Sequence, residues 1–386
     1  MRTVAIIGTG NISGFHLDGY IAFPERCKII ALCDIVPEKC KAKKQKYGLD
    51  GAAVYASHTE MLNSLAGKLD LVSICMPPFC HAEIAVDCLN AGVNVLVEKP
   101  MATSLAECDV MIDAAKRNGK TLAVVAQNRF RTPIMNLKKT LDAGLIGRVL
   151  HAQIDSHWWR GHSYYDLWWR GTWEKEGGGC TLNHAVHHID MLGWVLGLPE
   201  AVCAMLANTA HDNAEVEDLS VAVLRYAASP LTAKGALAQI TSSVVHHGEE
   251  QQIIFQGETA RISAPWKVTA NTASPDAFPA DDSVAASHIA ELNTFYDALP
   301  RLNYTAHTGE IDNVLASLEG TDTLLVDGAA GRRTIELITA IYKAGASAVT
   351  VALPLSKSDP FYTAAGIVAA APRFYQKTTS VKDFGG

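Results

Sequence analysis

Hydrophobic and polar residues alternate in two distinct ways along this chain, and the first pattern occupies residues 1–126. Short apolar runs rich in β-branched residues are separated there by longer amphipathic stretches, which is typical of buried strands that alternate with helices. The predicted strands are Thr3–Ile7, Lys28–Cys33, Leu69–Cys75, Val93–Val97 and Thr121–Ala126, and the predicted helices are 37–47, 57–65, 81–91 and 104–118. Because strands joined by helices pair in parallel, we predict a doubly wound parallel sheet over residues 1–126.

The second pattern begins at Gln127. A helix to about Ala143 and an amphipathic strand at 148–155 come first, and further predicted strands follow at 201–206, 219–226, 233–245, 251–256, 260–263, 266–270 and 349–353. Helices are predicted at 286–299, 311–327 with a break near Gly320, and 331–344. We therefore predict a second α/β domain over 127–386, built on a large open, mostly antiparallel sheet with one face left for solvent or a partner subunit.

The first strand leads directly into Gly8-Thr9-Gly10-Asn11-Ile12. Gly8 permits a tight turn, and Gly10 lets the backbone approach a pyrophosphate at the N-terminus of the next helix. The third glycine of the dinucleotide fingerprint should stand at position 13, where this chain has Ser13. Asp34 ends the second strand, and a carboxylate there accepts hydrogen bonds from both ribose hydroxyls and repels the extra phosphate of NADP. The pattern predicts NAD as the cofactor.

Two later strands also end in residues suited to a cofactor crevice. Met76-Pro77-Pro78 stops the third strand, because proline cannot continue a sheet ladder, and His81 opens the following helix. Glu98-Lys99-Pro100 follows the next strand. Since ligands of such sheets bind at the carboxyl ends of the strands, we expect Lys99 to point toward the nicotinamide position.

An aromatic and basic segment spans residues 157–173 and contains His157-Trp-Trp-Arg160, Tyr164-Tyr165-Asp166 and Trp168-Trp169-Arg170-Gly-Thr-Trp173. Aromatic faces beside charged groups can stack on the C–H surface of a sugar while its hydroxyls are hydrogen-bonded, which favours a substrate-binding loop. The alternative interpretation is an aromatic cluster at the edge of the core.

Gly177-Gly-Gly179 precedes a segment that carries Asn183, His184, His187, His188 and Asp190. On one continuous helix, Asn183, His187 and Asp190 would share a face, because they lie four and three residues apart. The spacing of the histidines also permits a metal site, but nothing in the sequence nominates a further ligand, so we predict no metal.

Composition narrows the range of partners. The 386 residues are 48% hydrophobic and 19% charged, with a formal net charge of −7 and no dense Lys/Arg cluster, which argues against nucleic acid or an anionic membrane as a partner. We find no targeting or membrane-spanning segment and expect a cytoplasmic protein. The nine cysteines show no C-x-x-C spacing and are best interpreted as small, reduced, mostly buried residues.

With these residues in place, the sequence resembles the Gfo/Idh/MocA family, named for glucose–fructose oxidoreductase and inositol dehydrogenase. The resemblance rests on the Gly8/Gly10 turn, Asp34, Pro77 with His81, Glu98-Lys99-Pro100, the triple glycine and the His187/Asp190 segment. It implies a Rossmann domain followed by an open-sheet α/β domain whose sheet face forms homodimers or homotetramers.

The resemblance also implies the roles of individual residues. Lys99 would contact the substrate hydroxyl and the cofactor, and His187 would act as a general acid or base. The cofactor set implied in this way is Gly8, Thr9, Gly10, Asn11, Ile12, Asp34, Pro77, His81, Glu98, Lys99, Gln127 and Arg170. The substrate set is Lys99, Arg160, Tyr165, Trp169, Trp173, Asn183, His184 and His187.

One residue departs from the family pattern. Many members carry Asp where this chain has Asn183, and an amide can orient His187 or a sugar hydroxyl but cannot share a proton. We therefore expect Lys99 to be the base, with His187 as an orienting or relay group.

The implied activity is NAD-dependent oxidation of a secondary hydroxyl of a sugar or glycoside, with the third hydroxyl favoured by the loop at 168–173. The alternative is a redox-neutral, NAD-dependent glycosidase that works by transient oxidation and elimination or hydrolysis. A non-enzymatic NAD sensor would leave Lys99 and His187 without a purpose.

Overall fold

The computed structural model describes residues 1–280 and 283–382 of the chain. Its first sheet has six parallel strands in the order β3-β2-β1-β4-β5-β6, which confirms the predicted Rossmann fold. The strands are β1 (Arg2–Ile7), β2 (Cys27–Cys33), β3 (Ala53–Tyr55), β4 (Leu71–Ile74), β5 (Asn94–Val97) and β6 (Leu122–Val124). The strand order reverses beside β1, so the loops after β1 and β4 diverge there and leave a crevice.

Five helices lie between these strands: α1 (Ser13–Ile21), α2 (Pro37–Lys46), α3 (His58–Ser64), α4 (His81–Asn90) and α5 (Leu105–Asn118). Local sequence explains the bounds of α5. The Ser104 side chain accepts a hydrogen bond from the Glu107 N–H, and Gly119 ends the helix in the left-handed conformation at φ 59°.

The second sheet has eight strands in the order β13-β12-β11-β7-β10-β9-β8-β16. These are β7 (Val149–His157), β8 (Ala201–Ala207), β9 (Leu219–Arg225), β10 (Thr232–Ser243), β11 (Gln251–Gly257), β12 (Arg261–Ala264), β13 (Lys267–Thr269) and β16 (Val351–Ala352). Only β7 and β10 pair in parallel within this sheet, so the expectation of a mostly antiparallel sheet is confirmed.

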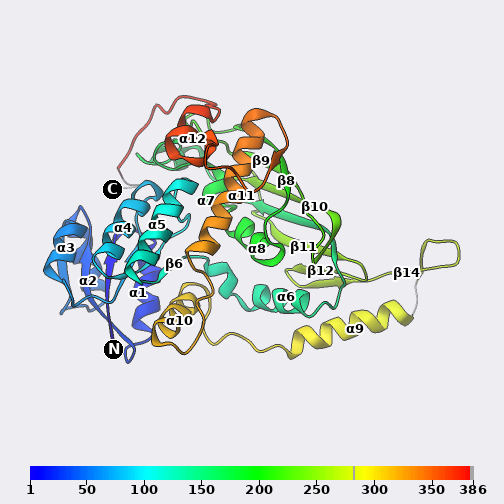
Figure 1. Cartoon of the computed structure of the whole chain (residues 1–386), viewed down its shortest axis with the longest axis horizontal. Coiled ribbons are helices and arrows are strands. Elements are labelled where there is room, and N and C mark those ends of the chain that lie inside the picture. The colour runs from blue at the N-terminus through cyan, green and yellow to red at the C-terminus, as the bar shows by residue number, and fades with distance from the viewer. Residues whose placement is uncertain (281–282, 383–386) are drawn as a thin grey trace.

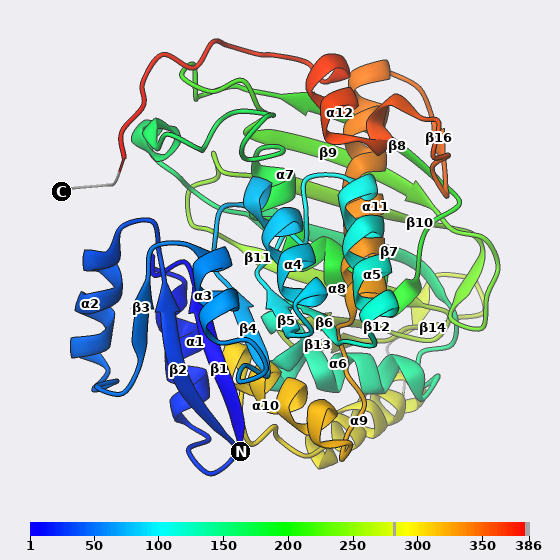
Figure 2. The ribbon, with the colours of Figure 1, turned by 60° about the vertical axis from the view of Figure 1, so that its left-hand side comes forward.

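The inner face of this sheet is covered by α6 (Thr132–Asp142), α7 (Cys180–Asn183), α8 (Val186–Leu196) and α11 (Gly328–Ser347). Helix α11 contacts both β8 and α5 and so lies between the two domains (Figure 2). Helix α9 (Ser283–Ala298) and the hairpin of β14 (Thr272–Ala273) and β15 (Pro279–Ala280) extend away from the body (Figure 1). Helix α12 (Ala364–Ala370) and four short 3-10 helices complete the elements: Pro78–Cys80, Gln127–Phe130, His162–Asp166 and Pro360–Tyr362.

Helix α10 (Ala306–Glu319) returns to the first domain. It packs on α1, and its Ile311, Val314 and Leu315 are buried in one cluster with residues of β1 and α1. The predicted break near Gly320 is confirmed, because Gly320 adopts the left-handed conformation at φ 74° and ends α10. The rest of the prediction was wrong, since α10 begins at Ala306 rather than at 311 and residues 321–327 form no helix. In space, α10, a part of the predicted second domain, therefore belongs to the Rossmann core.

Seven of the nine cysteine side chains are buried, while Cys80 is half-buried and Cys203 is exposed. Among the described residues, no helix combines the length and the apolar character needed to cross a bilayer.

Candidate active site

The loop after β1 has the geometry of a dinucleotide cradle. Gly8 adopts φ 87°, and a Cβ there would lie 2.5 Å from the Cys75 carbonyl oxygen of the neighbouring strand end. A Cβ on Gly10 would meet no atom within 4 Å, so this side of the loop is open. Ser13 takes the place of the third glycine, is fully buried and donates to the Gly10 carbonyl at 2.7 Å, which supports the turn.

Asp34 closes this loop from the end of β2. Its Oδ2 accepts hydrogen bonds from the Thr9 N–H at 2.8 Å and from the Thr9 hydroxyl at 3.0 Å, and its Oδ1 accepts from Val36 N–H. Ile35 beside it is 75% exposed. The open backbone at Gly10, the half-exposed carboxylate and this exposed apolar side chain fit the diphosphate, ribose and adenine of NAD.

The remaining residues of the predicted cofactor loops differ in their exposure to solvent. Asn11 is exposed, and Ile12 and Pro77 are half-buried at the same edge of the sheet. Gln127 follows β6, and its Oε1 is buried without a hydrogen-bond partner. An unpartnered acceptor at the carboxyl end of the sheet is consistent with a ligand in the crevice.

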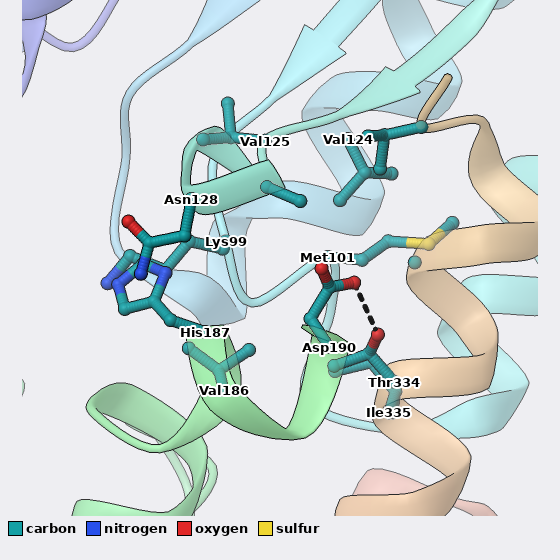
Figure 3. A pocket seen from close by; sticks show the side chains of 13 residues that line it. Lys99, Met101, Val124, Val125, Asn128, Val186, His187, Asp190, Thr334 and Ile335 are labelled. Carbon is teal, nitrogen blue, oxygen red and sulfur yellow. Dashed lines mark hydrogen bonds between the residues drawn. The ribbon is translucent and has the colours of Figure 1, made fainter. Parts of the chain in front are cut away.

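Lys99 and His187 line one cavity at the carboxyl end of β5 (Figure 3). The cavity measures about 20 Å³, enough for about one water molecule. The side chains of Lys99, His187 and Asn128 lie together at one end of it, and Asp190 and Thr334 lie at the other. The Lys99 ammonium group donates to the Asn183 backbone carbonyl at 3.3 Å.

The surroundings favour the neutral forms of both Lys99 and His187. Burial lowers the pKa of Lys99 from its ordinary value; the Glu98 carboxylate opposes this shift and Arg170 adds to it. Burial and then the neighbouring Lys99 hold the pKa of His187 well below its usual range. His187 is the one half-buried residue among residues 183–190, and its Nδ1 has no partner.

Asn183 and His187 do not share one helix face as predicted. Helix α7 ends at Asn183 and α8 begins at Val186, so the continuous helix that the spacing required is interrupted. The Asn183 amide donates instead to the Gly178 carbonyl at 3.4 Å. Asn183 therefore contributes its backbone carbonyl, which holds Lys99, and its side chain does not orient His187.

Asp190 lines the cavity with His187, but its carboxylate has other partners. It accepts two hydrogen bonds of 2.7 Å from the buried guanidinium of Arg129 and one of 2.9 Å from Thr334. The pair ties the segment after β6 to α8 and α11, which fixes the floor of the cavity.

Two residues predicted to bind the cofactor face inward. His81 is fully buried, with its ring nitrogens 2.9 Å from the Pro100 oxygen and 2.7 Å from the Met76 oxygen, so it braces the turns after β5 and β4. The carboxylate of Glu98 is buried against His16 and His307. The polar atoms of both side chains are hydrogen-bonded within the protein, so the structure does not support the predicted contacts of these side chains with NAD.

The aromatic segment is arranged around Arg170. Its guanidinium lies 4.2 Å from the ring centres of both Tyr164 and Trp169, and its Nη1 donates to the buried Glu176 carboxylate at 2.8 Å. The Arg170 Nε is buried without a partner. Tyr164 in turn contacts the ring of His184, whose Nδ1 also lacks a partner.

Arg160 approaches the same ring, with its guanidinium 5.8 Å from the centre of Tyr164, while its Nη1 donates to Glu249 at 2.5 Å. Burial, followed by the charge of Arg160, holds the pKa of His184 well below its usual range. Arg160 and Arg170 therefore lie around Tyr164 and His184. The charge of Arg170 also acts on Lys99, and that of Lys99 acts on His184. Their contact with substrate stays a prediction.

Tyr165 and Trp173 were wrongly predicted to bind substrate. They are only 1% and 2% exposed, and the Trp173 indole N–H donates to the Pro372 carbonyl while its ring packs edge-on against Tyr342. Both belong to the core, so the alternative interpretation of the aromatic segment holds for these two side chains.

Four residues of the candidate site were not proposed from the sequence. Asn128 and Thr334 line the cavity, and Tyr164 and Glu176 contact Arg170. Asn128 follows the last parallel strand, a position that could have been proposed from the same rule as Lys99. Sequence reasoning also missed the grouping of His16, Glu98 and His307, the one set of three metal-ligand residue types that converge within the described part of the chain. Their donor atoms bond to one another, so we interpret the group as a hydrogen-bonded network.

Two family models match this chain, one over each of the two domains. Residues 2–126 match the family model described as "Oxidoreductase family, NAD-binding Rossmann fold", and residues 134–263 match the "GFO/IDH/MocA C-terminal domain".

Curated relatives match over part of their length. D-glucoside 3-dehydrogenase of Escherichia coli is 30% identical over 51% of this chain and 54% of its own, and 2,7-anhydro-N-acetylneuraminate hydratase of Mediterraneibacter gnavus is 29% identical over 55% and 54%. The chain thus spans about half the length of these relatives.

Among solved structures, the WlbA dehydrogenase of Bordetella pertussis in complex with NADH and UDP-GlcNAcA is 29% identical, with a TM-score of 0.76 over 92% of this chain and 98% of that one. The fold, the cradle and both family models agree, and this protein belongs to the GFO/IDH/MocA family of NAD-binding oxidoreductases.

Proposed function

We propose that this protein is an NAD-dependent dehydrogenase that oxidises a secondary hydroxyl of a sugar or glycoside. The observation that carries the proposal is the pairing of Lys99 and His187 over one cavity, beside the open cradle at Gly10. Burial favours the neutral forms of both groups, and a lowered pKa suits the amine of Lys99 to accept a proton, whereas His187 stays neutral.

In the proposed reaction, Lys99 is the base. The Asn183 carbonyl holds its Nζ at 3.3 Å, and the neutral amine takes the hydroxyl proton of the substrate. His187 carries an unpartnered Nδ1, which orients a neighbouring hydroxyl or passes the proton onward. NAD, when bound, supplies the hydride acceptor.

The substrate class follows from the groups beside Lys99. Tyr164 and Trp169 each place an aromatic ring 4.2 Å from the guanidinium of Arg170, a combination suited to sugar C–H surfaces and hydroxyls. The names of the relatives support a glycoside oxidised at its third carbon, since one relative is a D-glucoside 3-dehydrogenase and a structural neighbour holds a nucleotide sugar acid.

The first test is Lys99→Ala in the full-length protein. We expect turnover to fall by about 100-fold or more, because general-base catalysis is lost, while NAD still binds. Turnover is followed by NADH absorbance with a panel of glycosides and uronic acids, and NAD affinity by calorimetry. Lys116→Ala, at an exposed site on α5, serves as the control, and near wild-type turnover of Lys99→Ala would contradict the assignment.

A redox-neutral reaction is the second candidate, and the hydratase among the relatives is the observation that favours it. In that case NAD stays bound and the hydride returns to the substrate. Release of aglycone, or addition of water, without net NADH would identify this activity.

We also propose that the outer face of the second sheet pairs with a second copy of the chain. Met205, Val221, Val223 and Leu237 lie on this face and are 45–80% exposed. Exposed apolar side chains clustered on adjacent strands are typical of subunit interfaces.

A further inference from the structure

Glu98 stands directly before Lys99 but takes no part in the reaction proposed above. It is 3% exposed, and its Oε1 lies 2.9 Å from His16 Nε2 and 3.3 Å from His307 Nε2. His16 belongs to α1 and His307 to the first turn of α10, so two distant parts of the chain meet at this carboxylate. A carboxylate buried to this degree requires donors on its oxygens.

The network continues behind His16. Its Nδ1 lies 3.1 Å from the Ser73 hydroxyl, which lies 2.7 Å from the Tyr20 hydroxyl. If Tyr20 donates to Ser73 and Ser73 donates to Nδ1, then Nε2 carries the proton and donates to Glu98. In this arrangement each hydrogen bond from Tyr20 through Ser73 and His16 to Glu98 has one donor and one acceptor, with His16 neutral and Glu98 ionised.

His307 completes the enclosure on the other side. Its ring stacks on Phe15, with ring centres 5.2 Å apart and planes at 20°, which fixes its orientation. The two histidine donors hold the pKa of Glu98 well below its usual range, although burial opposes them.

The second oxygen of Glu98 connects the network to Lys99. Glu98 Oε2 accepts the Lys99 backbone N–H at 3.1 Å. A fixed negative charge next to a buried ammonium group stabilises its charged form, so the state of Glu98 decides how readily Lys99 releases its proton.

We propose that His16 and His307 are positioning residues that act on Lys99 through Glu98: they keep Glu98 ionised, and its charge sets the fraction of Lys99 that is neutral. The catalytic meaning of this inference rests on the proposed function of Lys99. The hydrogen-bonded network does not depend on that function, because it is defined by contacts among His16, Glu98 and His307.

Other charged groups also face these two residues. Lys99 is approached by Arg170 and Glu176 from the aromatic segment and by His187 of α8. Glu98 is approached by Cys75 after β4, His81 of α4 and Glu310 of α10. None of these groups is substituted in the variants below. A difference in the Lys99 titration between variants therefore reports the effect of His16, Glu98 and His307.

The experiment measures the pH dependence of Lys99 acetylation in the full-length protein, by competitive labelling with acetic anhydride and mass spectrometry. Only the neutral amine reacts, so the midpoint reports the proton affinity of Lys99. Glu98→Gln should lower the midpoint by about one pH unit or more, because it removes the opposite charge. Lys116, labelled in the same sample, is the internal control.

The histidines are tested by pairs of variants. His16→Leu with His307→Leu removes both donors and should lower the Lys99 midpoint in the same direction as Glu98→Gln, whereas His16→Gln with His307→Gln keeps amide donors and should restore it toward the wild type. Adding the two leucine substitutions to Glu98→Gln should produce no further shift, because their effect passes through the carboxylate. If the double leucine variant misfolds, as its circular dichroism spectrum would reveal, His307→Leu alone is compared with His307→Gln.

An unchanged Lys99 midpoint in Glu98→Gln would overturn the proposal, and so would a shift in the double leucine variant that persists on the Glu98→Gln background. Retention of one zinc ion per chain, lost in His307→Leu, would also overturn it in favour of a metal site, since the three donor atoms lie within 4.8 Å of one another. Labelling needs neither NAD nor substrate, so its result stands whether or not sugar oxidation is found.

Discussion

At the scale of single residues, Glu176 is a buried carboxyl group whose ionisation is disfavoured by the fold. It is fully buried, accepts hydrogen bonds from Arg170 and from the Gly171 N–H, and burial raises its pKa to about 7. Because the folded pKa lies above the ordinary value of 4.5, the folded state binds this proton more tightly than the unfolded state.

The consequence is a loss of stability with rising pH. Between pH 5 and pH 8 the free energy of unfolding of the wild type should fall by about 2 kcal/mol relative to that of Glu176→Gln, since the unfolded chain ionises first. Urea unfolding of both proteins at the two pH values measures the difference. Glu174→Gln, at the exposed neighbouring position, is the control, and a difference independent of pH would refute the effect.

The sequence indicated the residues that stand at the carboxyl ends of strands, and it was less informative about buried partners. Lys99 and Asp34 lie where strand position predicts. Glu98 and His81 turn inward, because their partners come from α1, α10 and neighbouring turns that are distant in sequence. Local pattern carries no information on such contacts.

At the scale of elements, the triple glycine serves close packing. A Cβ on Gly178 would lie 2.1 Å from the Tyr342 hydroxyl, and one on Gly179 would lie 1.9 Å from the Glu217 carbonyl oxygen. The Glu217 carboxylate accepts the N–H groups of Gly179 and Thr181. These contacts seat α7 between β9 and α11, and so place the Asn183 carbonyl against Lys99.

Gly179→Ala should therefore destabilise the fold by about 3 kcal/mol, because the clash is with rigid backbone. Gly193→Ala is the matched control: Gly193 lies in α8, a Cβ there meets nothing within 4 Å, and the change should be neutral or stabilise by about 0.5–1 kcal/mol. Denaturant midpoints of the two variants provide the measurement, and equal midpoints would contradict this account of the glycines.

The same region explains why a predicted helix was wrong. The periodicity of residues 180–190 favours one helix, yet the chain forms α7 and α8 with a break at His184 and Ala185. The carboxylate that accepts a hydrogen bond from the first turn of α7 belongs to Glu217, which is distant in sequence. A local sequence pattern therefore could not predict where this helix begins. Most strands of the two sheets, by contrast, were predicted to within a few residues, because continuous apolar runs mark the buried strands of the first sheet and alternating residues mark strands of the second. The short strand β3 (Ala53–Tyr55) was missed.

At the scale of the whole molecule, the pairing of two chains through the outer sheet face, proposed above, can be tested by mutation. Met205→Lys with Val223→Lys should convert a dimer or larger assembly into monomer, because two charges would be buried without partners at the proposed interface. Light scattering during size-exclusion chromatography measures the mass. Val110→Lys, at an exposed site on α5, is the control; a monomeric wild type would refute the proposed pairing.

The return of α10 to the first domain limits how relatives of this protein can be recombined. Consider a chimaera in which residues 1–126 come from another family member. The residues at positions 16 and 98 would then come from the donor protein, whereas His307 would still come from this one. The unit that keeps these contacts intact in an exchange is therefore discontinuous, and it comprises the first 126 residues together with α10.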